Sequence, residues 1–303
     1  MRLDRDTSES TILVTGAAGQ LGSELRDLAE MYPSLHFRFF DRTDLPLDRP
    51  DLLAKVFEDL RPLVCLNAAA YTAVDKAESD AVHAFAINAE AVGDLAILCK
   101  LWGSLLIHIS TDYVFDGQGK EPYREVDPTS PLGVYGASKL LGEKLAFNTY
   151  ERVLVIRTSW VYSAYGKNFV KTMLRLMGEK ESLGVVDDQH GRPTYAADLA
   201  SAILDICALY QTVPFDVRRN DARFRGIYHY ADEGAITWYD FARAIASLSG
   251  SSCEINPIPT SAYPTPARRP AFSVLDTNRI EATFRLRIPD WKESLRRCLE
   301  KLK

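Results

Sequence analysis

Five short apolar runs, each followed by a longer segment, constrain the fold of this chain more than any other feature. The runs are rich in aliphatic and β-branched residues and are short, which is typical of buried strands. They lie at 11–16, 35–41, 63–69, 104–111 and 153–162. Strands that are buried on both faces and joined through helices form a parallel sheet with helices on both sides. The sequence therefore predicts an α/β fold, a doubly wound parallel sheet of the Rossmann type.

The second half of the chain lacks the regular alternation of apolar runs and longer segments. Beyond Tyr162, helical patterns are separated by loops that contain proline and glycine, notably 256–270. The helical patterns lie at 168–178, 196–210, 238–248 and 289–302. We therefore expect a smaller, irregular C-terminal substrate lobe. The predicted division is a dinucleotide-binding domain over 1–165, with later elements near 183–230 interleaved, and a mainly substrate-binding lobe over 166–303.

Charge and composition limit the partners and the compartment. A net charge of −5 and a pI near 5.6 argue against nucleic acid as a partner. The five cysteines are scattered without a C-x-x-C pair, which indicates reduced thiols in a cytoplasmic protein. No apolar run is expected to span a membrane. The charged segment 1–10 lacks the apolar stretch of a signal peptide and is predicted to be disordered.

A glycine-rich turn directly follows the first expected strand and opens a helix. Its glycines are Gly16, Gly19 and Gly22, with Gln20 and Leu21 between the last two. Glycines at such a junction permit a tight turn and let the backbone approach a pyrophosphate, to which the helix N-terminus presents N–H donors. Glycine also serves turns that bind nothing. The position between strand and helix nevertheless predicts a dinucleotide cofactor.

Polar residues after the second expected strand point to the adenosine end of that cofactor. Asp41 is placed to bind a ribose 2′-hydroxyl, whereas the adjacent Arg42 suits a 2′-phosphate, so the choice between NADH and NADPH stays open. Asp48 is placed to contact adenine or, as an alternative, to cap the next helix. Three small residues end the third strand, where a cofactor or close packing would require them: Ala68, Ala69 and Ala70.

A tyrosine and a lysine four residues apart predict the catalytic chemistry. On a helix, Tyr135 and Lys139 share one face, and a nearby cation would lower the pKa of the phenol. Tyr135 is then a plausible proton donor to a carbonyl oxygen, with Lys139 adjusting its pKa and binding a ribose. Ser110 and Thr111 end the fourth expected strand, where a hydroxyl can hydrogen-bond the same carbonyl. A surface helix turn is the alternative explanation of the tyrosine–lysine pair alone.

These motifs resemble the extended short-chain dehydrogenase/reductases, and among them most closely the dTDP-4-dehydrorhamnose reductases. The likeness covers nearly the whole chain. It rests on TGAAGQLGSEL, LNAAAYTAVDKAES, ISTDYVFDG, PLGVYGASKLLGE, RTSWVY, DQHGRPT and ARRPAFSVLDT. It implies that NADPH or NADH delivers hydride to the 4-keto carbon of dTDP-4-dehydro-6-deoxy-L-mannose while Tyr135 protonates the oxygen. The product would be dTDP-L-rhamnose.

The resemblance also implies roles for individual residues. Cofactor contacts would come from Gly19, Gln20 and Leu21 at the pyrophosphate, Asp41 and Asp48 at the adenosine, Ala68 to Ala70 in the middle, and Tyr135 and Lys139 at the ribose. Thr111, Asp112 and Trp160 would contact the substrate, and Val74 and Asp75 would lie on the loop that approaches its sugar. Arg268 and Arg269 are the candidates for its diphosphate, because guanidinium groups suit phosphate oxygens. Asn88 would organise the site.

Simpler explanations exist for several of these residues. Trp160 could be a core tryptophan, Asp75 could pair with Lys76 on the surface, Asn88 could be a buried amide bonded to backbone, and Arg268 with Arg269 could be an exposed basic pair.

No metal is predicted. Some relatives have a dimer bridged by magnesium, and Glu24 lies at one plausible ligand position, but Ala197 occupies another. The five histidines show no metal-ligand spacing, and His108, inside LLIHIS, is expected to be a hydrogen-bonded core residue. A homodimer is possible.

Two rival functions use the same fold. A sugar-nucleotide epimerase or dehydratase would retain its cofactor and return the hydride. A non-catalytic regulatory subunit, like the β subunit of methionine adenosyltransferase, would bind a partner enzyme instead. The motif TDYVFDG favours the reductase, and retention of Thr111, Tyr135 and Lys139 argues against the regulatory subunit.

Overall fold

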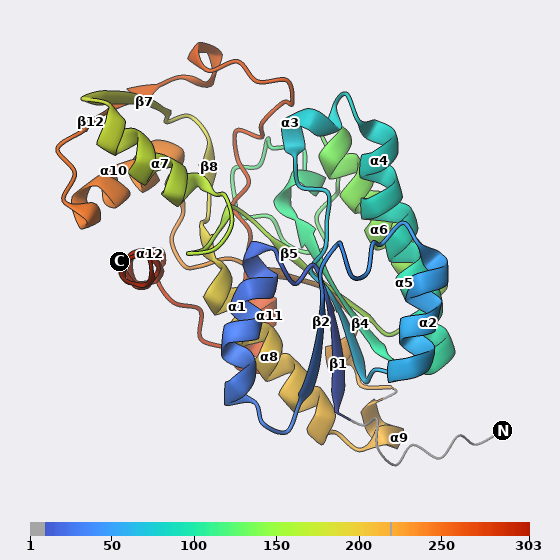
Figure 1. Cartoon of the computed structure of the whole chain (residues 1–303). Coiled ribbons are helices and arrows are strands. Elements are labelled where there is room, and N and C mark those ends of the chain that lie inside the picture. The colour runs from blue at the N-terminus through green and yellow to red at the C-terminus, as the bar shows by residue number, and fades with distance from the viewer. Residues whose placement is uncertain (1–9, 219) are drawn as a thin grey trace.

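A computed structural model describes residues 10–218 and 220–303. The segment 1–9, which holds most of the stretch predicted to be disordered, lies outside the described residues. The centre of the molecule is a six-stranded parallel sheet with helices on both faces (Figure 1), so the predicted doubly wound α/β fold is confirmed.

The sheet has the order β2-β1-β3-β4-β5-β10. Its strands are β1 (Thr11–Thr15), β2 (His36–Phe40), β3 (Val64–Asn67), β4 (Leu105–Thr111), β5 (Val153–Thr158) and β10 (Gly226–Tyr230). Alternate residues serve opposite faces, as the pleat requires. Ile12 and Val14 belong to the core below α1 (Gln20–Leu28) and α8 (Ala196–Thr212), whereas Leu13 belongs to the core on the opposite face. That second core is covered by α2 (Pro50–Leu60), α5 (Ala91–Trp102) and α6 (Val134–Thr149).

The order of the strands creates a crevice. β1 pairs with β2 on one side and with β3 on the other, so the connections that leave β1 and β3 diverge. In open parallel sheets, ligands bind at the carboxyl ends of strands at such a switch point. A Cβ added to Gly16 would lie 2.6 Å from the Ala69 nitrogen, so the turn after β1 touches the turn after β3. Glycine at this position is therefore a steric requirement, reinforced by its φ of +72°.

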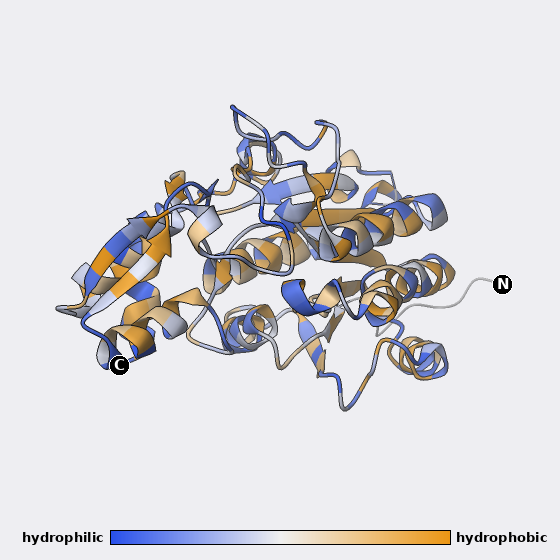
Figure 2. Ribbon diagram, turned by 90° about the horizontal axis from the view of Figure 1, so that it is seen from above, coloured by the Kyte–Doolittle hydropathy of each residue, from blue (hydrophilic) through white to orange (hydrophobic). Residues whose placement is uncertain are grey.

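The C-terminal lobe packs beside the sheet and has its own core (Figures 1 and 2). It contains α7 (Phe169–Glu179), β7 (Ser182–Val186), α10 (Trp238–Ser249), β12 (Glu254–Ile258) and α12 (Trp291–Lys301). Within 183–230, α8 packs on the sheet and β10 pairs in it, whereas β7 pairs with β12 in the lobe. The predicted boundary between residues 165 and 166 stays a prediction.

Shorter elements connect these parts. They are β6 (Val161–Tyr162), β8 (His190–Gly191), β9 (Thr194–Tyr195), β11 (Ile236–Thr237), α3 (Val74–Ala77), α4 (Ala81–Phe85), α9 (Phe215–Arg218) and α11 (Asn278–Phe284). A π-helical turn, Ala86–Glu90, joins α4 to α5. Single 3₁₀ turns lie at Ala29–Met31, Asp112–Val114, Ala222–Phe224 and Thr260–Ala262.

The structure corrects three expectations. The strand expected over 153–162 is interrupted at Ser159 and Trp160, because Trp160 has a φ of +48°, outside the range of a strand. The loop expected over 256–270 begins inside β12. The helical stretch 81–102 is long and apolar enough to cross a membrane by length and composition, contrary to the expectation of no such run. Its apolar residues Val92, Leu95 and Cys99 are buried against the sheet, which accounts for its hydropathy.

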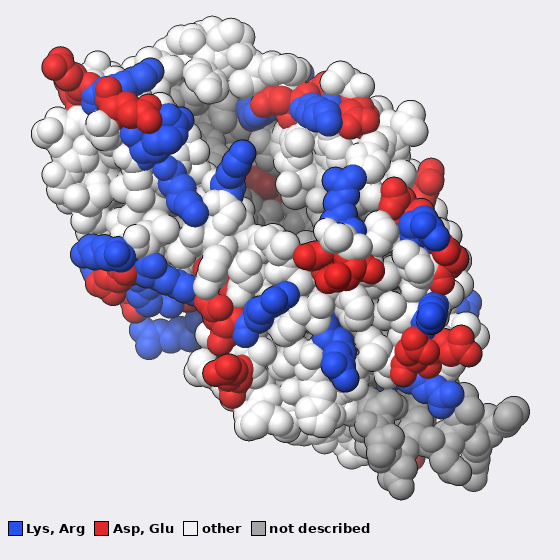
Figure 3. Space-filling view, viewed as in Figure 1, with Lys and Arg blue, Asp and Glu red and all other residues white. Residues whose placement is uncertain are grey.

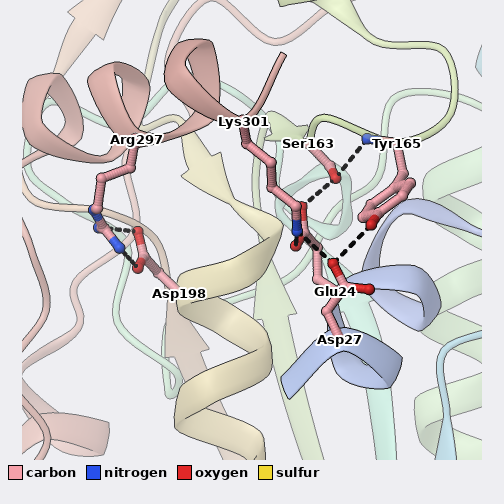
Figure 4. Close-up of polar contacts among 7 residues, drawn as sticks. All are labelled: Glu24, Asp27, Ser163, Tyr165, Asp198, Arg297 and Lys301. Atoms are coloured by element: carbon pink, nitrogen blue, oxygen red, sulfur yellow. Dashed lines mark hydrogen bonds and ion pairs between the residues drawn. The ribbon is translucent and has the colours of Figure 1, made fainter. Parts of the chain in front are cut away.

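The helix α12 is attached to α1 and α8 by ion pairs (Figure 4). Lys301 donates to the buried Glu24 at 2.7 Å and to Asp27 at 2.5 Å, both on α1. The other oxygen of Glu24 accepts a 2.6 Å hydrogen bond from Ser163. Arg297 makes a bidentate pair with Asp198 of α8, with both distances 2.7 Å. The lobe is thus tied to the helices on one face of the sheet.

Removing the cation at residue 301 tests this attachment. Lys301→Met leaves the carboxylate of Glu24 buried with one hydrogen bond, and we expect a loss of about 1–2 kcal/mol in unfolding free energy, because the lysine is partly exposed and screened. The measurement is chemical denaturation. Lys303→Met is the matched control with an exposed side chain, and Glu24→Gln combined with Lys301→Met should recover part of the loss. Equal stability of Lys301→Met and Lys303→Met would contradict the assignment.

Candidate active site

The crevice at the carboxyl end of the sheet opens to the surface. Figure 3 shows a hollow between the lobe and the sheet-bearing part, with Lys and Arg side chains at its edge and an acidic side chain in its depth. The glycine turn after β1, the alanine turn after β3 and the end of β4 all lie at this edge of the sheet. The predicted cofactor and catalytic residues therefore converge on one region.

The glycine turn has the shape of a phosphate cradle. Gly19 is the N-cap of α1 and has no side chain to satisfy the first N–H groups of the helix, which leaves them for an anion. A Cβ on Gly22 would lie 2.3 Å from the Gly16 carbonyl oxygen, so this position must also stay bare. Leu21 is a buried core residue. The side chain of Gln20 accepts from Asn168 at 2.9 Å, which ties the turn to the lobe.

The residues predicted to contact the adenosine of the cofactor make few contacts that indicate this role. Asp41 follows β2 and accepts hydrogen bonds from the backbone of Thr43 and Asp44, at 2.7 and 3.1 Å. Arg42 is exposed beside it. Asp48 is exposed and does not cap the next helix, whose N-cap is Arg49 without a side-chain bond, so the capping alternative is wrong.

Thr111 and Tyr135 meet at the end of β4. Thr111 caps the short turn Asp112–Val114, and its hydroxyl lies near enough to the phenol of Tyr135 to lower the pKa of that phenol. The N-terminus of α6 can approach that turn only because residue 136 is glycine, since a Cβ there would lie 2.2 Å from the Tyr113 carbonyl oxygen. The hydroxyl and the phenol predicted to act on one carbonyl are thus adjacent.

The pKa of the phenol differs from the expectation. Burial raises the pKa of Tyr135 to about 12, against the lowering effect of the Thr111 hydrogen bond, while the charge of Asp112 raises it further. The prediction that Lys139 lowers this pKa is therefore wrong for the ligand-free protein. The reason is that the Lys139 ammonium nitrogen is directed elsewhere, 2.7 Å from the Ile109 carbonyl oxygen and 3.3 Å from His108. Tyr135 remains protonated at neutral pH, as a proton donor must be.

Two buried ionisable groups flank the phenol. Burial lowers the pKa of Lys139 to about 8, an effect that Glu143 opposes. Burial raises the pKa of Asp112 to about 6. One carboxylate oxygen of Asp112 accepts from Thr111 at 3.1 Å, and the other is a buried atom without a hydrogen-bond partner. An unpartnered buried carboxylate oxygen at this place suits a ligand hydroxyl.

Trp160 does not behave as an ordinary core tryptophan. Its backbone is left-handed, and its ring stacks on Trp238 with centroids 3.6 Å apart. A Cβ on Gly191 would lie 2.5 Å from the Trp160 ring, so glycine is needed there too. Strained backbone of this kind concentrates at functional sites. The sequence analysis did not single out Trp238, and only its proximity in space to Trp160 reveals it.

Arg269 is paired in a way the sequence did not predict. Its guanidinium binds Asp75 through two bonds of 2.8 Å, so neither the exposed pair with Arg268 nor the pair of Asp75 with Lys76 describes it. Arg268 is exposed, and Lys76 approaches Asp80 instead. The ion pair joins the helix α3, which begins at Val74, to the loop after β12. Arg269 is thus paired with a carboxylate, whereas we expected it to be available to a diphosphate.

Asn88 is a buried amide whose hydrogen bonds connect two segments of the chain. It lies in the π-helical turn and binds both backbone groups of Tyr71, at 2.8 and 3.0 Å, and the Ser138 hydroxyl at 3.0 Å. It therefore links the loop after β3 to α6. The backbone-bonded alternative is correct, and the organising role of Asn88 stays a prediction.

The metal prediction is not tested. Among the described residues no group of three or more His, Cys, Asp or Glu side chains could bind an ion. Both oxygens of Glu24 are engaged by Ser163 and Lys301.

The fold, the glycine turn and the tyrosine beside the hydroxyl of β4 define an extended short-chain dehydrogenase/reductase. The family model of the RmlD substrate binding domain matches residues 10–303, and the chain belongs to the dTDP-4-dehydrorhamnose reductase family, as the resemblance predicted. The chain is similar to the dTDP-4-dehydrorhamnose reductase of Burkholderia thailandensis, with 45% identity over 96% of this chain and 98% of that protein.

Solved structures agree with this assignment. The dTDP-4-dehydrorhamnose reductase of Bacillus anthracis in complex with NADP has a TM-score of 0.88 and 35% identity, and the match covers 96% of this chain and 99% of that chain. The UDP-glucose 4-epimerase of Thermus thermophilus in complex with NAD has a TM-score of 0.75 at 21% identity over 96% and 98% of the two chains, a likeness of fold alone.

The glycine cradle can be tested by adding one methyl group. Gly22→Ala would force the turn away from α1, and we expect at least about tenfold weaker NADPH binding, or about 1.4 kcal/mol. The measurement is titration of NADPH by calorimetry, with circular dichroism to confirm folding. Gly178→Ala is the matched control, because a Cβ there meets nothing within 4 Å. Undiminished NADPH affinity of Gly22→Ala would exclude this turn as the phosphate site.

Proposed function

We propose that this protein reduces the 4-keto group of dTDP-4-dehydro-6-deoxy-L-mannose to dTDP-L-rhamnose with NADPH or NADH. Its relatives are named dTDP-4-dehydrorhamnose reductases, and the solved relative of Bacillus anthracis contains NADP. The single observation that carries the proposal is the close approach of the start of α6, which carries the protonated phenol of Tyr135, to the turn that Thr111 caps.

The chain's own groups have distinct tasks. The nicotinamide, when bound, supplies the hydride. The first turn of α1 binds the pyrophosphate, and the turn at Ala68, Ala69 and Ala70 leaves space for the middle of the cofactor. Thr111 orients the keto oxygen, and Tyr135 donates the proton to it. Lys139 is placed to donate to a ribose hydroxyl.

Substrate recognition is assigned to Asp112, Trp160, Val74 and Arg269. Asp112 accepts a hydrogen bond from a sugar hydroxyl through its unpartnered oxygen. One face of the Trp160 indole stacks on Trp238, and the other face packs on the sugar. Val74 lies at the start of α3, next to the Asp75–Arg269 pair. Arg269 would reach a diphosphate only by releasing Asp75. Asp41 and Asp48 would contact the adenosine, with Arg42 at a 2′-phosphate.

The two rival functions are less well supported. A regulatory subunit has no need of a buried phenol paired with a hydroxyl at a cofactor crevice. An epimerase returns the hydride to its substrate and consumes no cofactor. Consumption of one NADPH for each dTDP-sugar converted would therefore distinguish a reductase from an epimerase. We further propose that the protein acts in the cytoplasm. We also propose that it forms a homodimer, which measurement of its size in solution would test.

Tyr135→Phe tests the proton donor. Loss of a general acid should lower turnover by roughly two or more orders of magnitude, with little change in NADPH affinity. The measurement is NADPH absorbance with the dTDP-4-keto sugar. Tyr32→Phe, which removes a hydroxyl from a surface tyrosine bonded to Asp205, should keep its rate. Normal turnover by Tyr135→Phe would remove the phenol from this role.

The pKa of Asp112 predicts how substrate binding varies with pH. Because burial raises this pKa to about 6, the carboxyl is protonated below that pH and ionised above it. If the ionised form accepts the sugar hydroxyl, KM for the sugar nucleotide should rise as pH falls from 7 to 5. Asp112→Asn should have a raised KM without that pH dependence. A KM that varies with pH alike in both proteins would assign the titration to another group.

A further inference from the structure

The segment that follows β12 crosses from the lobe toward α3 and is fixed firmly at both ends. This segment, 259–273, is called the strap below, and Figure 1 shows it running across the top of the view. At one end, the backbone of Thr260 donates to Asp188 at 2.9 and 3.0 Å, and the Thr260 hydroxyl donates to the same carboxylate at 2.5 Å. At the other end, the backbone of Phe272 donates to the Gly117 carbonyl oxygen at 3.1 Å.

The middle of the strap is attached through a single side chain, that of Asp75 on α3. The Asp75 carboxylate accepts from the Ala267 backbone at 3.1 Å and from the Arg269 guanidinium through two bonds of 2.8 Å. Among the described residues, the hydrogen bonds that run from 261–269 to the rest of the chain all end at this carboxylate. Loss of one ion pair would therefore release the middle of the strap while both ends stay in place.

The ion pair lies close to the proposed proton donor. The ring of Tyr113 packs edge-on against the ring of Tyr135, with centroids 5.7 Å apart. Burial raises the pKa of the Tyr113 phenol, and the charges of Asp112, Arg269 and Asp75 also act on it, so the ion pair is near its hydroxyl. In a 4-keto sugar nucleotide, one pyranose ring separates the keto group from the diphosphate. The guanidinium is thus suitably placed for the diphosphate of a ligand whose keto group meets Tyr135.

The pair can open without disturbing the core. Hydrogen bonds from Arg269 lower the pKa of Asp75, against the effect of burial, so the carboxylate is charged at neutral pH. The side chain of Asp75 is 42% exposed and that of Arg269 is 22% exposed, so water can solvate the carboxylate once it is released. Ion pairs with this exposure contribute little to stability. A carboxylate and a phosphate bind a guanidinium in the same two-bond geometry, so a diphosphate can take the place of the carboxylate.

We propose that Asp75 is an internal counter-anion that occupies Arg269 in the ligand-free protein, and that the diphosphate of the substrate displaces it. This inference rests on the proposed function, because it concerns the same site. Part of the binding free energy of the diphosphate is used to break the pair, so Asp75 weakens the binding of substrate and product alike. The product carries the same diphosphate, and its release is therefore favoured.

Removal of the carboxylate should strengthen diphosphate binding. We would titrate dTDP by calorimetry into the NADPH-loaded protein, in which the glycine turn is occupied. We expect Asp75→Asn to bind dTDP about threefold or more tightly than the parent, and Arg269→Gln to bind it about tenfold or more weakly. The double variant Asp75→Asn with Arg269→Gln should match Arg269→Gln alone, because no guanidinium remains to be released.

A second ion pair of the same kind supplies the matched control. Asp51→Asn breaks the two-bond pair of Asp51 with Arg49 at the start of α2 and changes the net charge by the same amount, so dTDP affinity should stay unchanged. A dTDP affinity of Asp75→Asn equal to or below that of the parent would overturn the proposal. A gain that persists in the double variant would also overturn it, since the gain would then not pass through Arg269.

Inorganic pyrophosphate separates this proposal from the proposed function, because it needs the displacement but no nucleoside. Tighter pyrophosphate binding by Asp75→Asn, without NADPH consumption by the parent on the dTDP-4-keto sugar, would support the displacement and reject the reductase. Normal NADPH consumption by the parent, with equal pyrophosphate affinity in Asp75→Asn and the parent, would reject the displacement alone.

Discussion

The architecture depends on close approaches of backbone to backbone that leave no space for side chains. Gly16 lies against the turn after β3, Gly22 against the start of its own turn, and Gly136 against the carbonyl of Tyr113. Gly142 lies in the same way against the carbonyl of Asn88, where α6 crosses the π-helical turn. These contacts fix the distances from α1 to the sheet and from α6 to the end of β4. The predicted phosphate site and the predicted proton donor, on separate helices, thus lie at one crevice.

Burial determines the chemistry once those distances are fixed. The phenol of Tyr135, the carboxyl of Asp112 and the amine of Lys139 are all shifted toward their neutral forms, because each lies in a poorly solvated wall. The phenol stays protonated at neutral pH, whereas the carboxyl and the amine, with pKa values of about 6 and 8, titrate close to that pH. Lys and Arg side chains lie at the edge of the hollow instead, and Arg269 is paired with Asp75 in the loop after β12.

Sequence patterns predicted the sheet well, because a short apolar run between amphipathic helices can form few structures other than a buried strand. The prediction of a strand through Trp160 is wrong, since a residue with left-handed backbone leaves no mark in the hydropathy pattern. The candidate catalytic set could be located from the spacing of Tyr135 and Lys139 and from the position of Thr111. The Asp75–Arg269 pair joins residues 194 positions apart, and the stack of Trp238 on Trp160 joins distant segments of the chain. No local pattern encodes such contacts, and the pKa of Tyr135 depends on burial that only the assembled fold creates.

The ion pair of Glu24 and Lys301 spans 277 positions. During synthesis the first helix leaves the ribosome long before the residue that neutralises its carboxylate exists. The helix α8 and the strand β10, which complete that face and edge of the sheet, also come late. The sheet of the nascent chain therefore stays incomplete until α8 and β10 have been synthesised, and the carboxylate of Glu24 acquires its cation only after α12 follows them.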